Sequence, residues 1–301
     1  MYRCGFVGLI GQPNAGKSSL MNILVQEKVS IVTAKPQTTR RRVLGIVSDD
    51  QGQVIFVDAP GVLKAAKGLN AFLTQEAEDV IKQSDFLIAV LALDTASKEQ
   101  AEEIIKMVSE SGKPWMTVIT KVDLTEFMRR IAPLRDLSLK HKSCLGIVEM
   151  SSSWRDDAKA ARAEILRICL TKLPDTPKPL YDIELFTPHN TKDLVCEIIR
   201  EQCFEVLHHE IPYQIAVRMV KFDEADPKMP RIHAEILVSR DSHKPILIGK
   251  AGATIKEIGM LARKGIEKMM GQKVYLGLEV SVRDDWSENK NIMKELGYVV
   301  E

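Results

Sequence analysis

Eight residues near the N-terminus have the types and spacing of a phosphate-binding loop. The run GQPNAGKS at 11–18 matches G-x-x-x-x-G-K-[ST] and follows an apolar run, 4–10. Glycines let successive backbone N–H groups surround an anion, and the following helix adds its positive end. We expect Lys17 to reach the β and γ phosphates and Ser18 to bind Mg²⁺. The residues expected to contact the nucleotide here are Gly11, Asn14, Ala15, Gly16, Lys17, Ser18 and Ser19.

A second group of residues indicates which base is bound. The tetrapeptide Thr120-Lys121-Val122-Asp123 ends the apolar run 115–120. The Asp123 carboxylate can accept hydrogen bonds from N1–H and the 2-amino group of guanine, whereas adenine presents no such pair. An ordinary strand-end turn is the alternative for this tetrapeptide. Ser151 and Ser152 follow the apolar run 145–150 and are expected to contact the base from its other side.

Between these motifs lie residues suited to the metal and the γ-phosphate. In Asp58-Ala-Pro-Gly61, Asp58 is expected to hold Mg²⁺ through water and the Gly61 N–H to sense the γ-phosphate. The polar segment 33–40 has the character of a switch loop, and its Thr39 hydroxyl is expected to complete the Mg²⁺ shell. The candidate catalytic residues are Lys17, Thr39, Asp58 and Gly61, and the candidate metal ligands are Ser18, Thr39 and Asp58.

Alternating apolar runs and helical patterns predict the elements that position these residues. The runs are 4–10, 43–48, 53–57, 86–93, 115–120 and 145–150. Strands separated by helices predict an α/β fold with a doubly wound, mostly parallel sheet. The short turn 49–52 predicts that the second and third strands pair antiparallel as a hairpin.

Length and composition favour two domains in a reduced compartment. A chain of 301 residues exceeds the usual size of one core, and the proline-rich stretch 174–179 suits a boundary. We predict a nucleotide-binding domain at 1–174, a linker at 175–190 and a second domain at 191–301. The five cysteines show no C-x-x-C spacing, which favours free thiols in a cytosolic protein. No apolar run reaches the length of a membrane span.

The second domain carries a glycine loop typical of RNA-binding proteins. Gly249-Lys250-Ala251-Gly252 precedes a helical pattern to about residue 270, and a G-x-x-G between helices lets a nucleic-acid backbone approach. Seven basic residues near the loop face only Glu257 and Glu267, although the whole chain carries a net charge of only +1. These bases are Lys244, Lys250, Lys256, Arg263, Lys264, Lys268 and Lys273. A tight turn beside a solvated helix face is the alternative.

These motifs together resemble the Era family of bacterial GTPases, within the TrmE-Era-EngA group. The resemblance rests on GLIGQPNAGKSSLMN at 8–22, PQTTR at 36–40 and DAPG at 58–61. It continues through EIPY at 210–213, IGKAGATIKEI at 248–258 and LGY at 296–298, so it covers essentially the whole chain. It implies a phosphate-loop GTPase domain followed by a type II KH domain.

The resemblance also implies ligands and partners. The cofactors are GTP or GDP and Mg²⁺, and the partners are the single-stranded 3′ end of 16S rRNA and the 30S ribosomal subunit. The implied role is that of a GTP-hydrolysing switch in rRNA processing and ribosome assembly. Gly249, Lys250, Ala251, Gly252 and Lys256 are the expected RNA-binding residues. We expect a cytoplasmic protein that is a monomer, and peripheral association with the inner membrane is left open.

Four positions bear on how fast and how tightly the site works. Thr120 stands where the family commonly has Asn, and Ser152 where Ala is usual. Val62 follows Gly61 where Ras-like proteins place a water-orienting glutamine, which predicts slow hydrolysis, on the order of 10⁻⁴ s⁻¹. Asn14 matches the position that helps to hold K⁺ in potassium-activated relatives, so K⁺ stimulation is a hypothesis.

Other classes of function remain to be weighed. One is a KH RNA-binding module with weak or vestigial nucleotide hydrolysis, but Lys17, Ser18 and Asp58 are intact. Another is an enzyme that acts chemically on RNA, but no further catalytic constellation is present in the sequence. The helix predicted from Thr191 is acidic, and we expect it not to contact RNA. Its neighbours His208 and His209 are expected at a solvated surface rather than at a metal.

Overall fold

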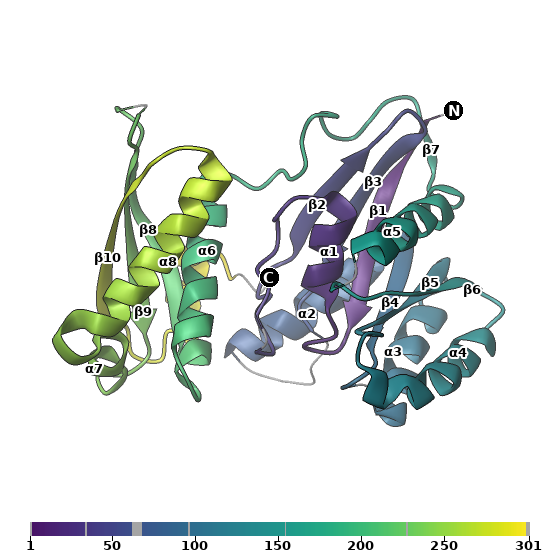
Figure 1. Cartoon of the computed structure of the whole chain (residues 1–301), viewed down its shortest axis with the longest axis horizontal. Helices are drawn as coiled ribbons and strands as arrows, with labels where there is room; N and C mark the ends of the chain where they lie inside the picture. The colour runs from purple at the N-terminus through teal and green to yellow at the C-terminus, as the bar shows by residue number, and fades with distance from the viewer. Residues whose placement is uncertain are drawn as a thin grey trace. The chain divides into compact units, whose positions relative to one another are not determined.

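The computed structural model describes residues 2–33, 35–61, 68–95, 97–153, 155–226 and 228–298. The chain divides into two compact units (Figure 1). Unit 1 comprises Met1–Ser30, Thr39–Ala65 and Leu73–Pro188, and unit 2 comprises Ile31–Thr38, Ala66–Phe72 and His189–Glu301. Two short segments from the first half of the sequence therefore fold with unit 2. Among the described residues, no helix is both long and apolar enough to cross a membrane.

Unit 1 is built around a mostly parallel sheet of order β2-β3-β1-β4-β5-β6. The strands are β1 (Tyr2–Gly11), β2 (Val43–Ser48), β3 (Gly52–Asp58), β4 (Phe86–Ala92), β5 (Trp115–Thr120) and β6 (Cys144–Glu149). The helices are α1 (Lys17–Val25), α2 (Gly68–Gln83), α3 (Lys98–Glu110), α4 (Ile131–Leu139) and α5 (Arg155–Leu170). The predicted doubly wound sheet is confirmed, including the antiparallel pairing of β2 with β3.

Helices cover both faces of this sheet because its central strands are apolar on both sides. On β4, Phe86, Ile88 and Val90 join the core with α1 and α5. The intervening Leu87 and Ala89 join the core with α2, α3 and α4. Strands β1, β3, β4, β5 and β6 run parallel, so the loops that follow them leave one edge of the sheet.

The predicted linker 175–190 is held against unit 1 over much of its length. Its first residues form β7 (Asp175–Thr176), which pairs antiparallel with the start of β1. Farther along, the buried Gln53 amide oxygen accepts hydrogen bonds from the backbone N–H groups of Leu180 and Tyr181, both 2.9 Å. The Ile46 N–H donates to the Phe186 carbonyl at 2.8 Å. The predicted domain boundaries stay predictions.

Unit 2 has the α-β-β-α-α-β order of a type II KH domain, as predicted. Its elements are α6 (Thr191–Val206), β8 (Ile215–Asp223), β9 (Arg231–Val238), α7 (His243–Ile248), α8 (Ala253–Met270), β10 (Tyr275–Val282) and α9 (Lys290–Glu295). The sheet has order β10-β9-β8, with β10 parallel and β8 antiparallel to β9. Helices α6 and α8 supply Ile198, Ile199, Ile258, Ala262 and Ile266 to the core.

Candidate functional site

The loop between β1 and α1 leads into a helix whose N-terminus has no side-chain cap. Asn14 and Gly16 adopt positive φ values of 62° and 84°. Such a backbone conformation favours glycine, which has no Cβ, as at Gly16. No side chain caps the start of α1, and its first turn carries no acidic residue. The first N–H groups of α1 and the helix dipole are therefore directed at whatever binds the loop.

Lys17 lies inside this loop and folds back over it. Its side chain is only 5% exposed, and Nζ donates hydrogen bonds to the carbonyls of Gly11 (3.1 Å) and Gln12 (3.0 Å). Burial lowers the pKa of the Lys17 ammonium to about 8, while the negative charge of Asp58 acts in the opposite direction. The loop thus holds one cation against its own backbone carbonyls.

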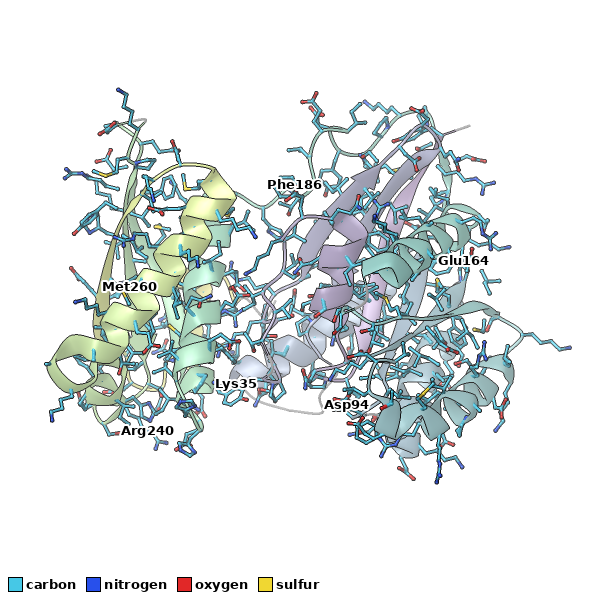
Figure 2. All side chains as sticks on the ribbon, viewed as in Figure 1. Lys35, Asp94, Glu164, Phe186, Arg240 and Met260 are labelled. Atoms are coloured by element: carbon cyan, nitrogen blue, oxygen red, sulfur yellow. The ribbon has the colours of Figure 1, made fainter. Side chains whose placement is uncertain are left out.

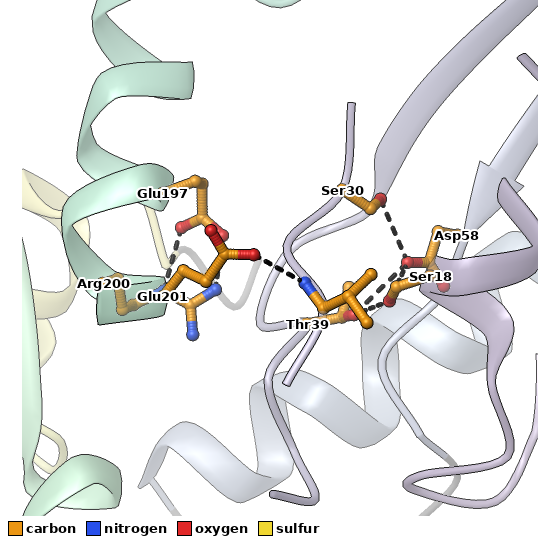
Figure 3. Close-up of polar contacts among 8 residues, drawn as sticks. Ser18, Ser30, Thr39, Asp58, Glu197, Arg200 and Glu201 are labelled. Atoms are coloured by element: carbon orange, nitrogen blue, oxygen red, sulfur yellow. Dashed lines mark hydrogen bonds and ion pairs between the residues drawn. The ribbon is translucent and has the colours of Figure 1, made fainter. Parts of the chain in front are cut away.

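Three hydroxyl groups converge on the Asp58 carboxylate at the carboxyl end of β3 (Figure 3). Ser18 Oγ donates to Oδ2 at 2.6 Å, Ser30 Oγ at 3.2 Å and Thr39 Oγ1 at 3.3 Å. Ser18 Oγ and Thr39 Oγ1 are also 2.9 Å apart. The predicted metal ligands Ser18, Thr39 and Asp58 are therefore brought together in one oxygen cluster.

The chemistry of this cluster suits a hard divalent cation. The Asp58 carboxylate is fully buried, and its second oxygen, Oδ1, has no hydrogen-bond partner among the described residues. Burial raises the pKa of Asp58, whereas the Lys17 charge and the hydroxyl hydrogen bonds lower it. An unpartnered buried carboxylate oxygen, on a carboxylate that three hydroxyls contact, offers the all-oxygen donor set that Mg²⁺ prefers.

Gly61 lies against the phosphate loop. A Cβ added at Gly61 would approach Pro13 N at 2.6 Å and Pro13 Cα at 2.7 Å, so a side chain would push the two loops apart. The Gly61 backbone and the phosphate loop are therefore in close contact. Val62, the next residue in the motif, lies outside the described residues.

The predicted base-recognition loop is oriented by two serines. Asp123 Oδ1 accepts a hydrogen bond from Ser151, and Oδ2 accepts one from Ser153 at 3.4 Å. Ser152, the other predicted residue, is exposed to solvent. Lys121 Nζ pairs with Asp94 at 2.9 Å, on the loop that follows β4 (Figure 2). The two serine hydrogen bonds fix the direction of the Asp123 carboxylate.

Thr120 ties the base-recognition loop to the phosphate loop. Its Oγ1 donates to the Ala15 carbonyl at 2.7 Å, and the side chain is 6% exposed. An Asn side chain at this position would carry two N–H donors and a carbonyl oxygen. Thr120 makes the connection between the loops with a single hydroxyl donor. The departure from the usual Asn thus preserves a link between the two loops.

In unit 2 the GKAG loop is shaped by backbone conformation alone. Gly249, Ala251 and Gly252 have φ values of 75°, 52° and 78°. A Cβ at Gly249 would lie 2.2 Å from Thr254 Oγ1, whereas a Cβ at Gly252 would meet nothing within 4 Å. The loop therefore needs glycine at its first position to pack, while its last position faces open space. No side chain caps the N-terminus of α8, which starts at Ala253.

Comparisons with known proteins match both halves of the chain. Residues 6–121 match the family model of a 50S ribosome-binding GTPase, and residues 210–287 match that of a KH domain. GTPase Era of Geobacter metallireducens is 38% identical over 301 residues, with 99% of this chain and 98% of the relative covered. GTPase Era of Syntrophus aciditrophicus is 36% identical, with coverages of 99% and 96%. The chain belongs to the Era family. It is a GTPase that hydrolyses GTP to GDP and phosphate.

Solved structures of Era share the fold of the whole chain. A variant of Aquifex aeolicus Era bound to GDP and aluminium fluoride is 32% identical, with a TM-score of 0.90 over 99% of this chain and 100% of that one. Era in complex with MgGDPNP and nucleotides 1506–1542 of 16S ribosomal RNA is 33% identical, with a TM-score of 0.91 over 100% of both chains. The predicted Era fold of a GTPase domain and a KH domain is confirmed.

Several residues of the Era-type site were not predicted. Ser30 contacts Asp58, Ser153 contacts Asp123 and Asp94 pairs with Lys121. None belongs to the motifs used for prediction, although Asp94 directly follows the run 86–93, at the same sheet edge as the motifs. That placement is a usable signal, because ligand-facing loops follow the carboxyl ends of parallel strands.

The acidic helix α6 is not uniformly solvated. His208 and His209, which follow it, are exposed as expected. Glu201, by contrast, is only 4% exposed. In the sequence, nothing distinguishes it from the other acidic residues of the helix. A buried carboxylate on this helix requires partners, and one of them, the Val32 N–H, lies in another segment of the chain.

Proposed function

We propose that this GTPase binds the single-stranded 3′ end of 16S rRNA through its KH domain, in a manner controlled by the bound nucleotide. It would act on the small (30S) ribosomal subunit, in rRNA processing and ribosome assembly. The observation that carries the proposal is the similarity, over the full length of both chains, to an Era structure crystallised with MgGDPNP and 16S rRNA nucleotides 1506–1542.

The nucleotide site supports a GTP- and Mg²⁺-dependent switch. Ser18, Thr39 and Asp58 would hold Mg²⁺, which neutralises negative charge on the phosphates when it is bound. Lys17 contributes a full positive charge at the phosphate loop, and Gly61 presents its backbone N–H to the γ-phosphate. Asp123, held by Ser151, selects guanine: its two carboxylate oxygens, fixed in direction, require two neighbouring N–H donors on the base.

The remaining nucleotide contacts follow the same loops. Gly11, Asn14, Ala15, Gly16 and Ser19 would surround the phosphates with backbone N–H groups. Lys121 and Ser152 flank the base-recognition loop. Hydrolysis is expected to be slow because no glutamine follows Gly61. K⁺ stimulation through Asn14 is tested by comparing turnover in potassium and sodium buffers, and equal rates would reject it.

The KH domain supports the RNA part of the proposal through shape and charge. The seven basic residues near the GKAG loop are all exposed, and one of them, Lys273, is paired with Glu267 at 3.2 Å. The exposed charges of the others favour an approaching phosphate backbone. Gly249 and Gly252 keep the loop free of side chains, and Lys250 and Lys256 flank the open N-terminus of α8. Ile246 is 53% exposed beside the loop, where it offers an apolar surface to bases. The protein is proposed to work as a cytoplasmic monomer, with any inner-membrane association being peripheral.

A gel-shift titration tests this function. A short single strand with the sequence of the 16S rRNA 3′ end is titrated with the full chain at fixed salt, in the presence of GDPNP or GDP. The expected result is binding of the single strand in preference to a duplex, with affinities that differ between the two nucleotides. Equal affinities with both nucleotides would reject nucleotide control, and preference for the duplex would reject the proposed RNA target.

A further inference from the structure

The loop 31–38 lies between Ser30 and Thr39, which both contact Asp58 of the oxygen cluster, but it folds with unit 2. Its flanking residues, Ser30 and Thr39, both bond to Asp58 within unit 1. The loop itself, Ile31–Thr38, groups with the KH unit. The segment that brings Thr39 to the oxygen cluster is therefore anchored by residues outside the nucleotide-binding motifs.

The first anchor is a buried carboxylate of helix α6. The backbone N–H of Val32 donates to Glu201 Oε1 at 3.1 Å (Figure 3), and the other Glu201 oxygen accepts from Gln202 Nε2 at 3.2 Å. Glu201 is 4% exposed, although a carboxylate on a helix surface normally stays in water. A hydrogen bond to a charged acceptor in such a place is stronger than one at the surface.

The second anchor is Lys35 of the loop, which contacts the C-terminal end of α6. Lys35 Nζ donates to the backbone carbonyls of Phe204 and Leu207 at the C-terminal end of α6 (Lys35 is labelled in Figure 2). The last carbonyls of a helix lack partners within the helix, and the negative end of the helix dipole favours a cation there. The loop is thus held at two points by side-chain-to-backbone bonds.

We propose that Glu201 and Lys35 are positioning residues for the GTPase reaction, which hold loop 31–38 so that the Thr39 hydroxyl is ready to bind the Mg²⁺ of a triphosphate. The inference rests on the proposed role of Thr39 as a metal ligand. Ordering a loop costs conformational entropy, and anchors that order it before ligand binding remove that cost from the binding step. Because GDP lacks the γ-phosphate that such switch loops enclose, the anchors favour triphosphate over diphosphate.

Two pairs of variants separate this role from simple packing. Glu201→Ala removes the acceptor, whereas Glu201→Gln keeps an oxygen that can accept the Val32 N–H bond. Lys35→Met keeps the length of the side chain without its donors, whereas Lys35→Arg keeps donors. Glu205→Ala, an exposed position on α6, is the matched control. The readout is the dissociation constant of the full chain for a fluorescent GDPNP and for a fluorescent GDP, both with Mg²⁺.

Glu201→Ala and Lys35→Met are expected to weaken GDPNP binding about 3- to 10-fold, the effect of one or two hydrogen bonds, with GDP affinity unchanged. The conservative variants and Glu205→Ala should match the parent. In nucleotide-free protein, amide exchange of loop 31–38 should be faster in Glu201→Ala and restored in Glu201→Gln. Unchanged or tighter GDPNP binding, or equal losses for both nucleotides, would overturn the inference.

Thr39→Ala, measured in parallel, distinguishes failure of the inference from failure of the proposed site. If Thr39→Ala loses its preference for GDPNP while Glu201→Ala and Lys35→Met keep theirs, the anchors have no positioning role and the metal site stands. If Thr39→Ala also keeps its preference, Thr39 is not the metal ligand and the inference falls with it.

Discussion

The nucleotide site and the GKAG loop, which we propose to bind phosphate-bearing ligands, are built by opposite means. In the nucleotide site, functional side chains are buried and bonded to one another: Asp58 is 0% exposed, Lys17 5% and Thr39 8%. In the GKAG loop, both glycines have positive φ values (75° and 78°), and the neighbouring Lys250 is exposed. One site is a fixed constellation of polar groups, and the other is a backbone shape surrounded by exposed charges.

This difference predicts how each site responds to change. Removing one group from a buried network leaves its partners unsatisfied, so a single substitution has a large effect. Exposed charges act additively and are screened by salt, so each one matters less and its effect depends on ionic strength. Substitutions in the two sites should therefore differ in size and in salt dependence.

The largest effect is expected for Lys17→Ala. The substitution removes the one full positive charge from the phosphate loop, and truncating a buried charged partner costs about 4 kcal/mol, or roughly 1000-fold in affinity. Calorimetric titration with GTP and Mg²⁺ measures it. Unchanged GTP affinity would show that the backbone amides alone hold the phosphates.

Asp123→Asn should change which base is bound. The substitution replaces one acceptor oxygen with a donor, so the site loses the guanine 2-amino contact and gains one to the 2-oxo group of xanthine. GTP affinity should fall by roughly 100-fold or more, and xanthosine triphosphate should become the preferred ligand. A variant that still prefers GTP would exclude Asp123 as the base-recognition residue.

In the RNA loop, the double substitution Lys250→Asp with Ala251→Asp should weaken binding of a single strand about 10- to 100-fold at low salt. Aspartate tolerates the left-handed conformation of Ala251 (φ 52°), so the loop should still fold. GTP hydrolysis should be unaffected. Lys290→Asp, on the exposed surface of α9, is the charge control and should bind RNA like the parent. Equal losses in both proteins would assign the effect to overall charge.

The smallest effect is expected for Thr120→Val. The isosteric change removes the hydroxyl that bonds to the Ala15 carbonyl, which should cost about 1 kcal/mol and weaken GTP and GDP binding about 5-fold. Preference for guanine over adenine should not change, because Asp123 is untouched. Competition titrations with GTP, GDP and ATP measure both quantities, and altered base preference would contradict the assigned role.

The strands and the strand-end motifs could be predicted because each depends on local sequence. Runs of apolar residues specify buried strands, and parallel strands bring their carboxyl ends to one edge, so Asp58 and Asp123 could be placed before the structure was known. The GKAG loop could be predicted for the same reason, since its glycines are required by the local backbone.

Contacts between segments distant in sequence could not be predicted. Ser30 and Ser153 lie in loops whose paths depend on tertiary packing, and neither belongs to a motif. Glu201 reads as one of several acids on an amphipathic helix, and only the fold shows that it accepts a bond from Val32. Similarly, Gln53 looks like an ordinary strand residue, yet its amide holds the chain at Leu180.

The contrast between the two sites is tested most directly by measuring both affinities on the same two variants. GTP and single-stranded RNA dissociation constants are determined for Lys17→Ala and for the Lys250→Asp, Ala251→Asp protein, with the RNA titrations carried out without nucleotide at two salt concentrations. Lys17→Ala should lose GTP and keep RNA, whereas the double variant should lose RNA, with a weaker salt dependence, and keep GTP. If either variant lost affinity for both GTP and RNA, the conclusion that the two sites are built separately would be contradicted.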